Sequence, residues 1–355
     1  MKIAIVAGGT GGHIYPGIAV AEEIKQRNPK AEIVFIGSPE GLEKDIIPRE
    51  GYQLKLVRAR GLQRNLSYKA LSAPMICLIG FFQSLIFLLK FKPQIVFATG
   101  GYVSLPVLAA AKLLGIRIFI HEQNVIPGMV IKICQRFASK TFLTFNESQK
   151  YIQGIVVGDP VRKAITNMDR DTAREKLGLK ADQIAVVVMG GSQGSKRLNE
   201  IVIAAAELIP DNYELIHIIG NRDFPWVNNY LKGKKIANYR SLPYVYDEMP
   251  TLLAAADLVI SRAGATAISE FLVRGLPMIL IPYPYAAENH QFYNAQSVSI
   301  PGAAILIEEK DFSKEKMLSF LSTKQLDYAK MKNASLSLAK PNAAERIVDN
   351  IYAKA

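Results

Sequence analysis

One pattern occurs twice in the chain, near the N-terminus and again in the middle. Residues 3–12 read IAIVAGGTGG and residues 185–194 read AVVVMGGSQG, so in each case an apolar run of strand length enters a glycine loop. A helical stretch and a second apolar run follow both loops, over residues 16–26 and 32–36 and over residues 198–208 and 214–219. This order indicates a βαβ unit. The chain is therefore expected to fold as two similar α/β halves.

Apolar runs separated by helical stretches continue in both halves. Strands are expected over residues 94–98, 116–120, 141–145, 258–261 and 278–281, with helices over residues 103–114, 130–137 and 265–274. Uninterrupted apolar strands with intervening helices are typical of parallel sheets that are covered on both faces. The expected fold class is therefore α/β.

The length of the chain also favours two domains, because 355 residues exceed one ordinary domain. A short apolar run ends at the turn Gly158-Asp159-Pro160, which interrupts regular structure. We expect an N-terminal domain over residues 1–160 and a C-terminal domain over residues 161–341. A helix over about residues 342–355 is a candidate to pack back on the first domain.

The composition limits the classes of partner. The chain has 43 Lys and Arg against 31 Asp and Glu, a formal net charge of +12. This excess suits a nucleic acid, an anionic membrane surface or a phosphorylated small molecule, or it serves solubility alone. No basic run interleaved with aromatic residues occurs, which argues against nucleic acid. Two Cys and four His, without a CxxC or a Cys/His cluster, predict neither a disulfide framework nor a metal site.

Residues 71–89 contain no charged residue. As a helix they would extend roughly 28 Å, close to the ~30 Å of a bilayer core. Three interpretations stay open: a membrane span, a buried helix, and a helix that packs one face on the core and offers Ile79, Phe82, Ile86 and Leu89 to a membrane surface. Nearby basic residues favour docking on anionic headgroups, namely Arg58, Arg60, Arg64, Lys69, Lys90 and Lys92.

The apolar run at the N-terminus is too short for a secretory signal, which predicts a cytoplasmic location.

Both glycine loops are candidate phosphate sites, because a helix N-terminus after a strand presents N–H groups and a positive dipole end. Neither loop has the dinucleotide fingerprint: the first places Ile14 where the last glycine belongs, and the second lacks the spacing. The P-loop pattern also fails at residues 191–196. Taken alone, each loop is equally compatible with a purely structural turn.

Polar residues at strand ends supply the candidate chemistry. His13 directly follows the first glycine loop, where it is placed to take a proton near neutral pH. The run His121-Glu-Gln-Asn124 closes an apolar strand, and Glu270 lies just inside the helix after residues 261–264, where a carboxylate suits ribose hydroxyls. Asp169-Arg-Asp171 fits a metal–nucleotide pattern, but its position before a helix indicates N-terminal helix charge instead.

Seven blocks together resemble one family, the bacterial UDP-N-acetylglucosamine transferases that convert lipid I to lipid II in peptidoglycan synthesis. They occur in the family's order and extend from residue 1 to about residue 295. Each block is weak alone, whereas seven in order are specific. The blocks are GGTGGH (8–13), TGGYVS (99–104), HEQN (121–124), GDPVR (158–162), GGSQG (190–194), SRAG (261–264) with Ser269 and Glu270, and HQ (290–291) with Asn294 and Ala295.

The resemblance implies a GT-B fold, with two Rossmann-like domains whose parallel sheets face a central cleft and with the sugar nucleotide held mainly by the C-terminal domain. The substrate-binding residues that it implies are Thr10, Gly11, Gly12, Asn124, Arg162, Ser192, Gln193, Tyr246, Ala265, Thr266, Ala267, Ile268, Ser269, Glu270 and Gln291. Among these, Asn124 and Gln291 would contact GlcNAc, and Glu270 would bind the ribose. Asp159 stands where the family often has Asn. This difference removes no group that the chemistry needs.

The implied activity is an inverting transfer of GlcNAc from UDP-GlcNAc to lipid I on the cytoplasmic side of the cell membrane. His13 is the candidate base, and Arg162 with the helix N-termini would stabilise the leaving diphosphate without a metal or another cofactor. The implied partners are UDP-GlcNAc, lipid I and the anionic inner-membrane surface. Two alternatives stay open: a GT-B transferase with a different lipid acceptor, and a non-catalytic, membrane-docked protein that binds nucleotide sugars.

Overall fold

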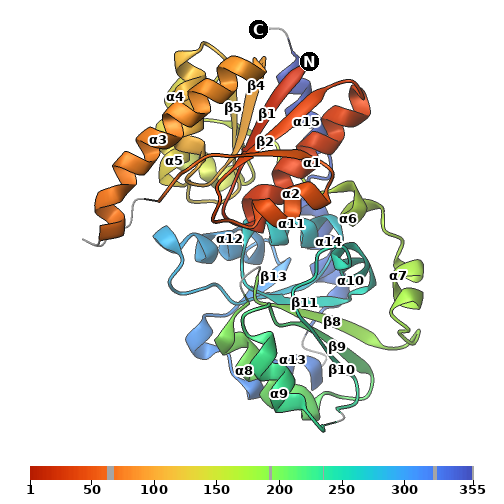
Figure 1. Cartoon of the computed structure of the whole chain (residues 1–355). Helices are drawn as coiled ribbons and strands as arrows, with labels where there is room; N and C mark the ends of the chain where they lie inside the picture. The colour runs from red at the N-terminus through yellow and green to blue at the C-terminus, as the bar shows by residue number, and fades with distance from the viewer. Residues whose placement is uncertain (62–67, 192–193, 235, 323–325, 354–355) are drawn as a thin grey trace. The chain divides into compact units, whose positions relative to one another are not determined.

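The computed structural model of the chain consists of two compact α/β units (Figure 1). Unit 1 comprises Met1–Arg162 together with Pro341–Ala355, and unit 2 comprises Lys163–Lys340. The structure describes the whole chain except residues 62–67, 192–193, 235, 323–325 and 354–355, and the side chains of residues 68–73 and 322. Arg64, Ser192 and Gln193 therefore lie outside the described residues, as does the side chain of Lys69.

Unit 1 is built on a seven-stranded parallel sheet with the order β3-β2-β1-β4-β5-β6-β7. Its strands are β1 (Lys2–Ala7), β2 (Glu32–Gly37), β3 (Gln53–Leu56), β4 (Ile95–Gly100), β5 (Arg117–Glu122), β6 (Lys140–Leu143) and β7 (Ile155–Val156). Its α-helices are α1 (Gly11–Arg27), α2 (Glu43–Arg49), α3 (Tyr68–Phe91), α4 (Ser104–Leu113), α5 (Met129–Cys134) and α15 (Ala343–Tyr352). Central strands such as β4 are buried along their whole length, which explains their uninterrupted apolar sequences.

Unit 2 has a six-stranded parallel sheet with the order β10-β9-β8-β11-β12-β13. Its strands are β8 (Ile184–Met189), β9 (Tyr213–Ile218), β10 (Tyr239–Leu242), β11 (Leu258–Ser261), β12 (Met278–Leu280) and β13 (Ala304–Leu306). Its α-helices are α6 (Lys163–Asn167), α7 (Arg170–Lys176), α8 (Lys196–Ala205), α9 (Phe224–Leu231), α10 (Met249–Ala255), α11 (Ala265–Val273), α12 (His290–Ser299), α13 (Lys314–Ser322) and α14 (Tyr328–Leu338). The α/β class expected from the sequence is confirmed in both units.

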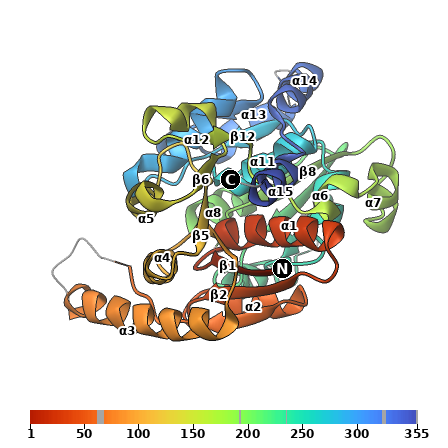
Figure 2. The same ribbon diagram turned by 90° about the horizontal axis from the view of Figure 1, so that it is seen from above.

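The C-terminal helix α15 packs against α1 of unit 1, as Figures 1 and 2 both show. Arg27 at the end of α1 forms an ion pair with Asp349 and donates to the backbone oxygen of Glu345 at 3.3 Å. Lys140 at the start of β6 donates to the Asn350 side chain at 2.9 Å. Helix α15 therefore completes the unit that contains the first residues of the chain.

Helix α1 starts five residues earlier than its expected position at residue 16. Thr10 has extended backbone angles at the N-cap, and Gly11 begins the helix directly after the glycine loop. Pro16 lies inside α1, so its ring does not mark the helix start. The early start is the physical reason why His13 lies in the first turn of a helix and not in a loop.

The start of α7 confirms a role in capping for Asp169. Its side chain accepts a hydrogen bond from the Thr172 backbone N–H at 2.8 Å, and this bond is the main cause of the lowered pKa of the Asp169 carboxyl. The carboxylate therefore stabilises the N-terminus of α7, as its sequence position indicated.

Helix α3 is the only helix in the described residues that is long and apolar enough to cross a membrane, over Pro74–Phe91. Only 17% of this window is buried, so the interpretation as a buried core helix is wrong. The inner face packs against the segment after β3: the Arg58 backbone N–H donates to the Gln83 side chain, and a side chain at Gly80 would meet the Arg58 carbonyl oxygen. The outer face carries the four apolar side chains that the third interpretation offers to a membrane surface, Ile79, Phe82, Ile86 and Leu89, and all four are exposed.

Candidate functional site

The carboxyl ends of the central strands define one candidate site in each unit. In unit 1, the chain leaves β1 toward β2 on one side, whereas β4 and β5 continue on the other side. In unit 2, β8 and β11 are related in the same way. Ligands of open parallel sheets bind outside the strand ends at such a switch point. Both glycine loops lie there, after β1 and after β8.

The His13 side chain packs against the backbone of the first glycine loop. Nδ1 of His13 lies 3.1 Å from the carbonyl oxygen of Gly8 and 3.5 Å from the Thr10 hydroxyl. The Thr99 hydroxyl, at the end of β4, donates to the His13 carbonyl oxygen at 2.6 Å. Because a carbonyl can only accept, the close contact with Gly8 favours the tautomer that carries its proton on Nδ1. The basic lone pair of a neutral His13 then lies on Nε2.

Two glycines at the end of β4 allow the TGGYVS block to approach the first glycine loop. Both have positive φ angles, 111° at Gly100 and 83° at Gly101. A Cβ atom on Gly100 would lie 2.9 Å from the His13 ring, and one on Gly101 would lie 2.5 Å from the Gly8 carbonyl oxygen. Neither residue can therefore be replaced by a larger one without displacing the loop. This contact explains the glycine pair of the block.

Hydrogen bonds at the end of β5 hold the HEQN block in place. Gln123 donates to the Thr99 carbonyl oxygen at 2.6 Å, which links the block to β4. Glu122 accepts from the backbone N–H of Asn124 at 2.9 Å, from the Asn124 side chain at 3.2 Å and from the backbone N–H of Gly128 at 2.8 Å. Burial raises the pKa of the Glu122 carboxyl, although these hydrogen bonds oppose the shift. The block therefore positions Asn124 through Glu122.

The GDPVR block packs against β5 and α1. His121 is fully buried with Nε2 at 2.9 Å from the Gly158 carbonyl oxygen, and burial lowers its pKa to about 4. Arg162 is also buried, with its guanidinium 4.0 Å from the centre of the Tyr15 ring and 3.5 Å from the Glu50 carboxylate. Arg162 thus lies in unit 1. It contacts Tyr15, which follows His13 by two positions in α1.

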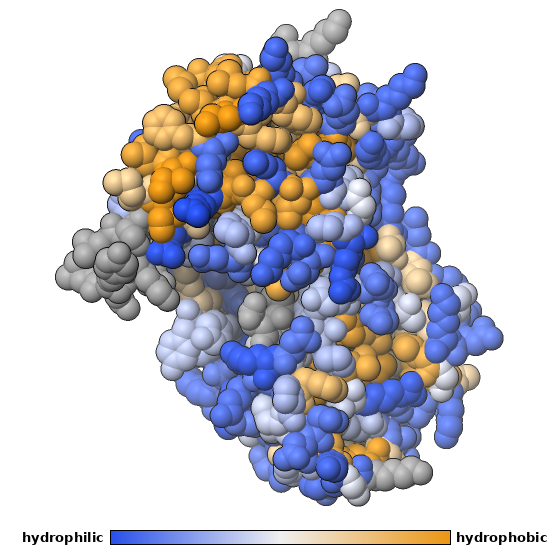
Figure 3. Space-filling model, viewed as in Figure 1, coloured by the Kyte–Doolittle hydropathy of each residue, from blue (hydrophilic) through white to orange (hydrophobic). Residues whose placement is uncertain are grey.

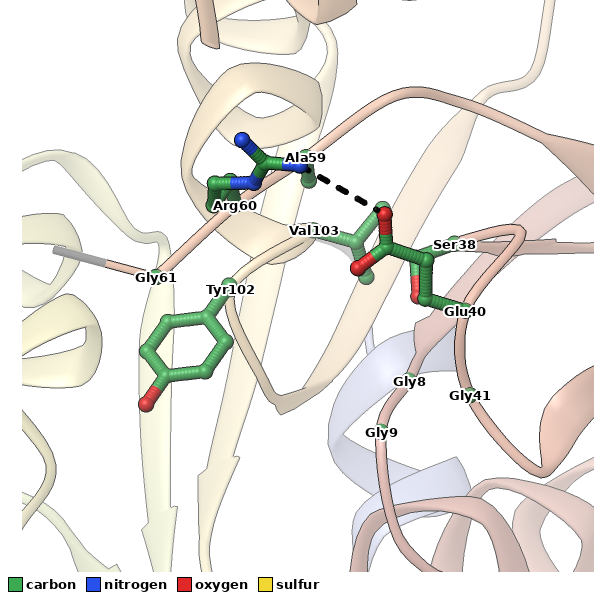
Figure 4. A pocket seen from close by; sticks show the side chains of 10 residues that line it. All are labelled: Gly8, Gly9, Ser38, Glu40, Gly41, Ala59, Arg60, Gly61, Tyr102 and Val103. Atoms are coloured by element: carbon green, nitrogen blue, oxygen red, sulfur yellow. Dashed lines mark ion pairs between the residues drawn. The ribbon is translucent and has the colours of Figure 1, made fainter. Parts of the chain in front are cut away.

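A cavity of about 550 Å³ opens beside the first glycine loop in unit 1. Figure 4 shows Glu40 and Arg60 reaching toward each other, 3.8 Å apart, with the exposed Tyr102 ring nearby. Ten residues line it, namely Gly8, Gly9, Ser38, Glu40, Gly41, Ala59, Arg60, Gly61, Tyr102 and Val103. The cavity therefore combines charged groups and an aromatic ring with closely approachable glycine backbone.

In unit 2, Arg262 connects the second glycine loop to the ends of β11 and β12. It is 6% exposed and donates to the Ser195 hydroxyl from Nε at 3.2 Å and from Nη2 at 2.6 Å. It also donates to the carbonyl oxygens of Ile281 and Pro282 and forms an ion pair with Glu309. The sequence patterns included Arg262 in a block but assigned it no role. Its position identifies it as the residue that holds these loops together.

The other candidate residues of unit 2 lie around the N-terminus of α11. Gly264 is the N-cap, and Glu270 is nearly buried on the second turn. Gln291 at the start of α12 accepts from the backbone N–H groups of Ala263 at 3.3 Å and Tyr283 at 2.9 Å. The structure therefore brings the helix residues 265–270 and Gln291 to one edge of the sheet.

Tyr246 follows β10. Its ring lies edge to face with that of Tyr244, and the two ring centres are 4.6 Å apart.

A buried polar network of residues from α8, β9 and β10 lies beside the second glycine loop. His217 on β9 pairs through Nε2 with the Asn199 side-chain oxygen and through Nδ1 with the Tyr239 hydroxyl, both at 3.0 Å. Asn199 on α8 donates to the Ile219 carbonyl oxygen, and a Cβ on Gly194 would lie 2.4 Å from that same oxygen. The network therefore determines how closely the loop can approach β9.

We expect His217 to make unit 2 less stable in mild acid. Burial lowers its pKa to about 3 from a usual value near 6.5, so only the unfolded chain takes up this proton as the pH falls below 6.5. The free energy of unfolding then decreases by up to about 1.4 kcal/mol per pH unit through this group. Urea unfolding between pH 7.5 and 5 should show a shallower decline for His217→Gln than for the wild type. Equal slopes would contradict this assignment.

Comparisons with known proteins agree with the division into two units. Residues 3–143 match the Glycosyltransferase family 28 N-terminal domain, and residues 185–349 match the Glycosyltransferase family 28 C-terminal domain. A UDP-N-acetylglucosamine--N-acetylmuramyl-(pentapeptide) pyrophosphoryl-undecaprenol N-acetylglucosamine transferase from Caldicellulosiruptor saccharolyticus is 40% identical, over 98% of this chain and 96% of its own length. A relative with the same name from Desulforudis audaxviator is also 40% identical, over 99% of this chain and 98% of its own. A crystal structure of MurG from Acinetobacter baumannii has a TM-score of 0.76 at 27% identity and covers 99% of both chains.

Proposed function

The chain belongs to glycosyltransferase family 28, among the UDP-N-acetylglucosamine–N-acetylmuramyl-(pentapeptide) pyrophosphoryl-undecaprenol N-acetylglucosamine transferases, and from this premise we propose its reaction and the residues that perform it. The enzyme transfers GlcNAc from UDP-GlcNAc to the C4 hydroxyl of N-acetylmuramic acid in lipid I. The products are lipid II and UDP. The two alternatives, another lipid acceptor and a non-catalytic protein, have no comparable support.

The observation that carries the proposed mechanism is the position of His13 in the first turn of α1, with Nδ1 against the Gly8 carbonyl oxygen. The acceptor oxygen attacks the anomeric carbon of GlcNAc and forms the new C–O bond with inversion. The bond from that carbon to the β-phosphate oxygen breaks, and its electron pair leaves with UDP. Nε2 of His13 takes the proton of the acceptor hydroxyl, which balances the charge of the step.

Donor binding is assigned to unit 2. Glu270 receives the two ribose hydroxyls, Gln291 meets the sugar, and the N-terminus of α11 faces the diphosphate with its residues Ala265, Thr266, Ala267, Ile268 and Ser269. The positive end of a helix dipole and its N–H groups suit a diphosphate. Ser192 and Gln193 are proposed for the phosphates from the family resemblance alone. Tyr246 is proposed to present its backbone to the uracil.

Glu270→Ala is expected to raise the KM for UDP-GlcNAc by about 10- to 100-fold with a much smaller effect on kcat. Hydrogen bonds to a charged group contribute about 1.5–3 kcal/mol, and the ribose contact is made equally in the ground state and the transition state. Steady-state kinetics with varied UDP-GlcNAc checks this. Glu207→Ala, which removes an exposed carboxylate elsewhere in unit 2, is the matched control. An unchanged KM would remove Glu270 from the donor site.

Acceptor binding is assigned to unit 1. The cavity beside Gly8 and Gly9 lies next to the loop that precedes α1, whose first turn contains His13, and Arg60 contributes a positive charge to its lining. A diphosphate-linked sugar needs such a combination of positive charge, hydroxyl-binding groups and accessible backbone. Thr10, Gly11 and Gly12 begin the adjoining helix α1 and are proposed to contact the sugar and diphosphate. Asn124, held by Glu122, is proposed to contact GlcNAc, and Arg162 the donor phosphates.

The outer face of α3 is proposed to dock on the anionic cytoplasmic surface of the cell membrane. Figure 3 shows an extensive apolar surface over the part of unit 1 where Figure 1 draws α3 and α4. No Asp or Glu occurs between Glu50 and Glu122, so the flanking charges of α3 are all positive. Lys55 and Lys2 lie 6.0 and 5.3 Å from the Phe87 and Phe91 rings of this helix. An apolar face with a basic border is the signature of peripheral binding to anionic lipid.

The decisive experiment for the reaction is transfer of labelled GlcNAc from UDP-GlcNAc to lipid I, with and without a chelator. We expect labelled lipid II and stoichiometric UDP in both arms. Absence of product would overturn the proposed function, and loss of product only with chelator would overturn the metal-independent mechanism. Release of UDP without labelled lipid II would indicate hydrolysis of the donor, with GlcNAc transferred to water, and would overturn lipid I as the acceptor. Among the described residues, no group of three or more His, Cys, Asp or Glu side chains could hold a metal ion.

A further inference from the structure

Glu43 is a fully buried carboxylate that no sequence pattern identified. It is the first residue of α2, and its side chain turns back toward the ends of β1 and β2. Oε1 accepts from the Ser38 backbone N–H at 2.6 Å and from the Ser38 hydroxyl at 2.8 Å, and Oε2 accepts from the Gly9 backbone N–H at 2.9 Å. These hydrogen bonds all come from neutral donors. Burial of an ion is unfavourable unless hydrogen bonds compensate it, and these three bonds satisfy the carboxylate at this position.

The surrounding backbone is shaped for this carboxylate. A Cβ atom on Gly37 would lie 2.4 Å from Cγ of Glu43, and one on Gly41 would lie 2.0 Å from Oε2. A Cβ on Gly8 would lie 3.0 Å from Oε1. Three glycines, one just after β1, one at the end of β2 and one in the loop after β2, therefore leave the space that the Glu43 side chain fills. The contact requires the tertiary structure, because the carboxylate reaches 34 positions back along the chain to Gly9.

Glu43 and His13 bind the two ends of one peptide group. The N–H of the Gly8–Gly9 peptide donates to Glu43, and the C=O of the same peptide lies 3.1 Å from Nδ1 of His13. The positive φ of Gly9, 94°, and the approach of Gly101 to the Gly8 carbonyl fix the orientation of this peptide. Hydrogen bonds in such a chain polarise one another, so a carboxylate on the N–H makes the carbonyl a stronger acceptor.

We propose that Glu43 is a positioning residue that acts on His13 through the Gly8–Gly9 peptide. The carboxylate holds the peptide so that its carbonyl accepts the Nδ1 proton, which keeps the lone pair on Nε2 and stabilises the imidazolium that forms when His13 takes the acceptor's proton. The arrangement performs the task of the carboxylate in a carboxylate–histidine pair, with a peptide group between the two side chains. The inference rests on the proposed function and on His13 as its base.

The alternative is a purely structural role, because the Glu43 hydrogen bonds also connect two loops that line the unit 1 cavity. Loss of these hydrogen bonds would weaken acceptor binding and stability whether or not His13 is present. Action through the peptide affects the proton transfer and therefore kcat. The two roles are separated by a double-mutant cycle with His13.

The test measures kcat and KM for the wild type, Glu43→Gln, His13→Ala and the double variant. Glutamine keeps the size of the side chain but cannot accept hydrogen bonds at both ends. We expect Glu43→Gln to lower kcat by about 10- to 100-fold, with the KM for UDP-GlcNAc within about twofold. In the His13→Ala background the same change should alter kcat by less than about twofold. Glu23→Gln, which removes a buried carboxylate on α1 that pairs with Arg27, is the matched control and should leave kcat unchanged.

A kcat loss of equal size in both backgrounds would overturn the proposal and leave Glu43 a structural residue. Full activity of His13→Ala would instead overturn the base assignment, and absence of transfer by the wild type would overturn the function. A second measurement does not depend on folding of a Glu43 variant. Nitrogen-15 NMR of the wild-type histidines, with His13 assigned by its loss in His13→Ala, should show neutral His13 protonated on Nδ1. Protonation on Nε2 would contradict the proposal.

Discussion

Replacement of His13 by alanine is expected to lower kcat for GlcNAc transfer by about 10²- to 10⁴-fold, the usual contribution of a general base. The methyl group cannot accept the proton of the acceptor hydroxyl, so the hydroxyl must attack before it is deprotonated. Because His13 is assigned to the acceptor's proton and the donor is assigned to residues of unit 2, the KM for UDP-GlcNAc should change little. Single-turnover transfer to lipid I measures the chemical step directly.

The control is Gln26→Ala, which alters an exposed position near the other end of α1 and should retain wild-type kinetics. A His13→Ala variant that keeps more than about a tenth of the wild-type kcat would exclude His13 as the base. Added imidazole gives an independent readout. Partial recovery of the rate with imidazole is expected for a missing base and not for a distorted loop.

The double variant Phe82→Glu and Ile86→Glu is expected to lose binding to anionic vesicles by at least about 100-fold. Both side chains lie on the outer face of α3, with 53% and 54% of their surface exposed, so the substitutions leave the packed face of the helix intact. Burial of a large apolar side chain contributes about 1.5–3 kcal/mol, and two together exceed the roughly 2.7 kcal/mol that corresponds to 100-fold. Co-sedimentation with vesicles that contain an anionic lipid measures the loss.

Leu208→Glu with Leu336→Glu is the matched control, because these exposed apolar residues lie in unit 2. It should bind vesicles as the wild type does. Transfer to a short-chain, water-soluble acceptor should be unaffected by either double variant. Higher salt should weaken wild-type binding, since the basic residues beside α3 act on lipid headgroups through screened charge. Vesicle binding that survives the α3 substitutions would place the docking surface elsewhere.

The periodicity of the sequence predicted the strands better than the helix ends. The expected strand over residues 258–261 coincides with β11, because its apolar run is bounded by polar residues on both sides. The start of α1 was missed by five residues, since glycine and histidine carry no helix signal of their own. The edge strands β3, β10 and β13 were not predicted, whereas the short apolar run before Gly158 coincides with β7. Edge strands bury only part of their surface and so lack a continuous apolar run.

The candidate site was predictable where residues are adjacent along the chain. A glycine loop followed by a helix N-terminus is a local pattern, so the loops and His13 were found directly from the sequence. Arg262 and Glu43 were not found, because their roles depend on groups from other strands and loops. A single Arg or Glu has no spacing or period that distinguishes a buried residue from an exposed one.

The sequence by itself determined the two βαβ halves, the position of both glycine loops at the ends of their first strands, and the family to which the blocks belong. These features arise from contacts between neighbours in the chain and from periodic burial. Only the tertiary structure decided whether α3 is buried and which groups surround the Gly8–Gly9 peptide. The physical reason is that β2 lies beside β1 in the sheet, so the residues after β2 bring the Glu43 carboxylate to an N–H at the end of β1.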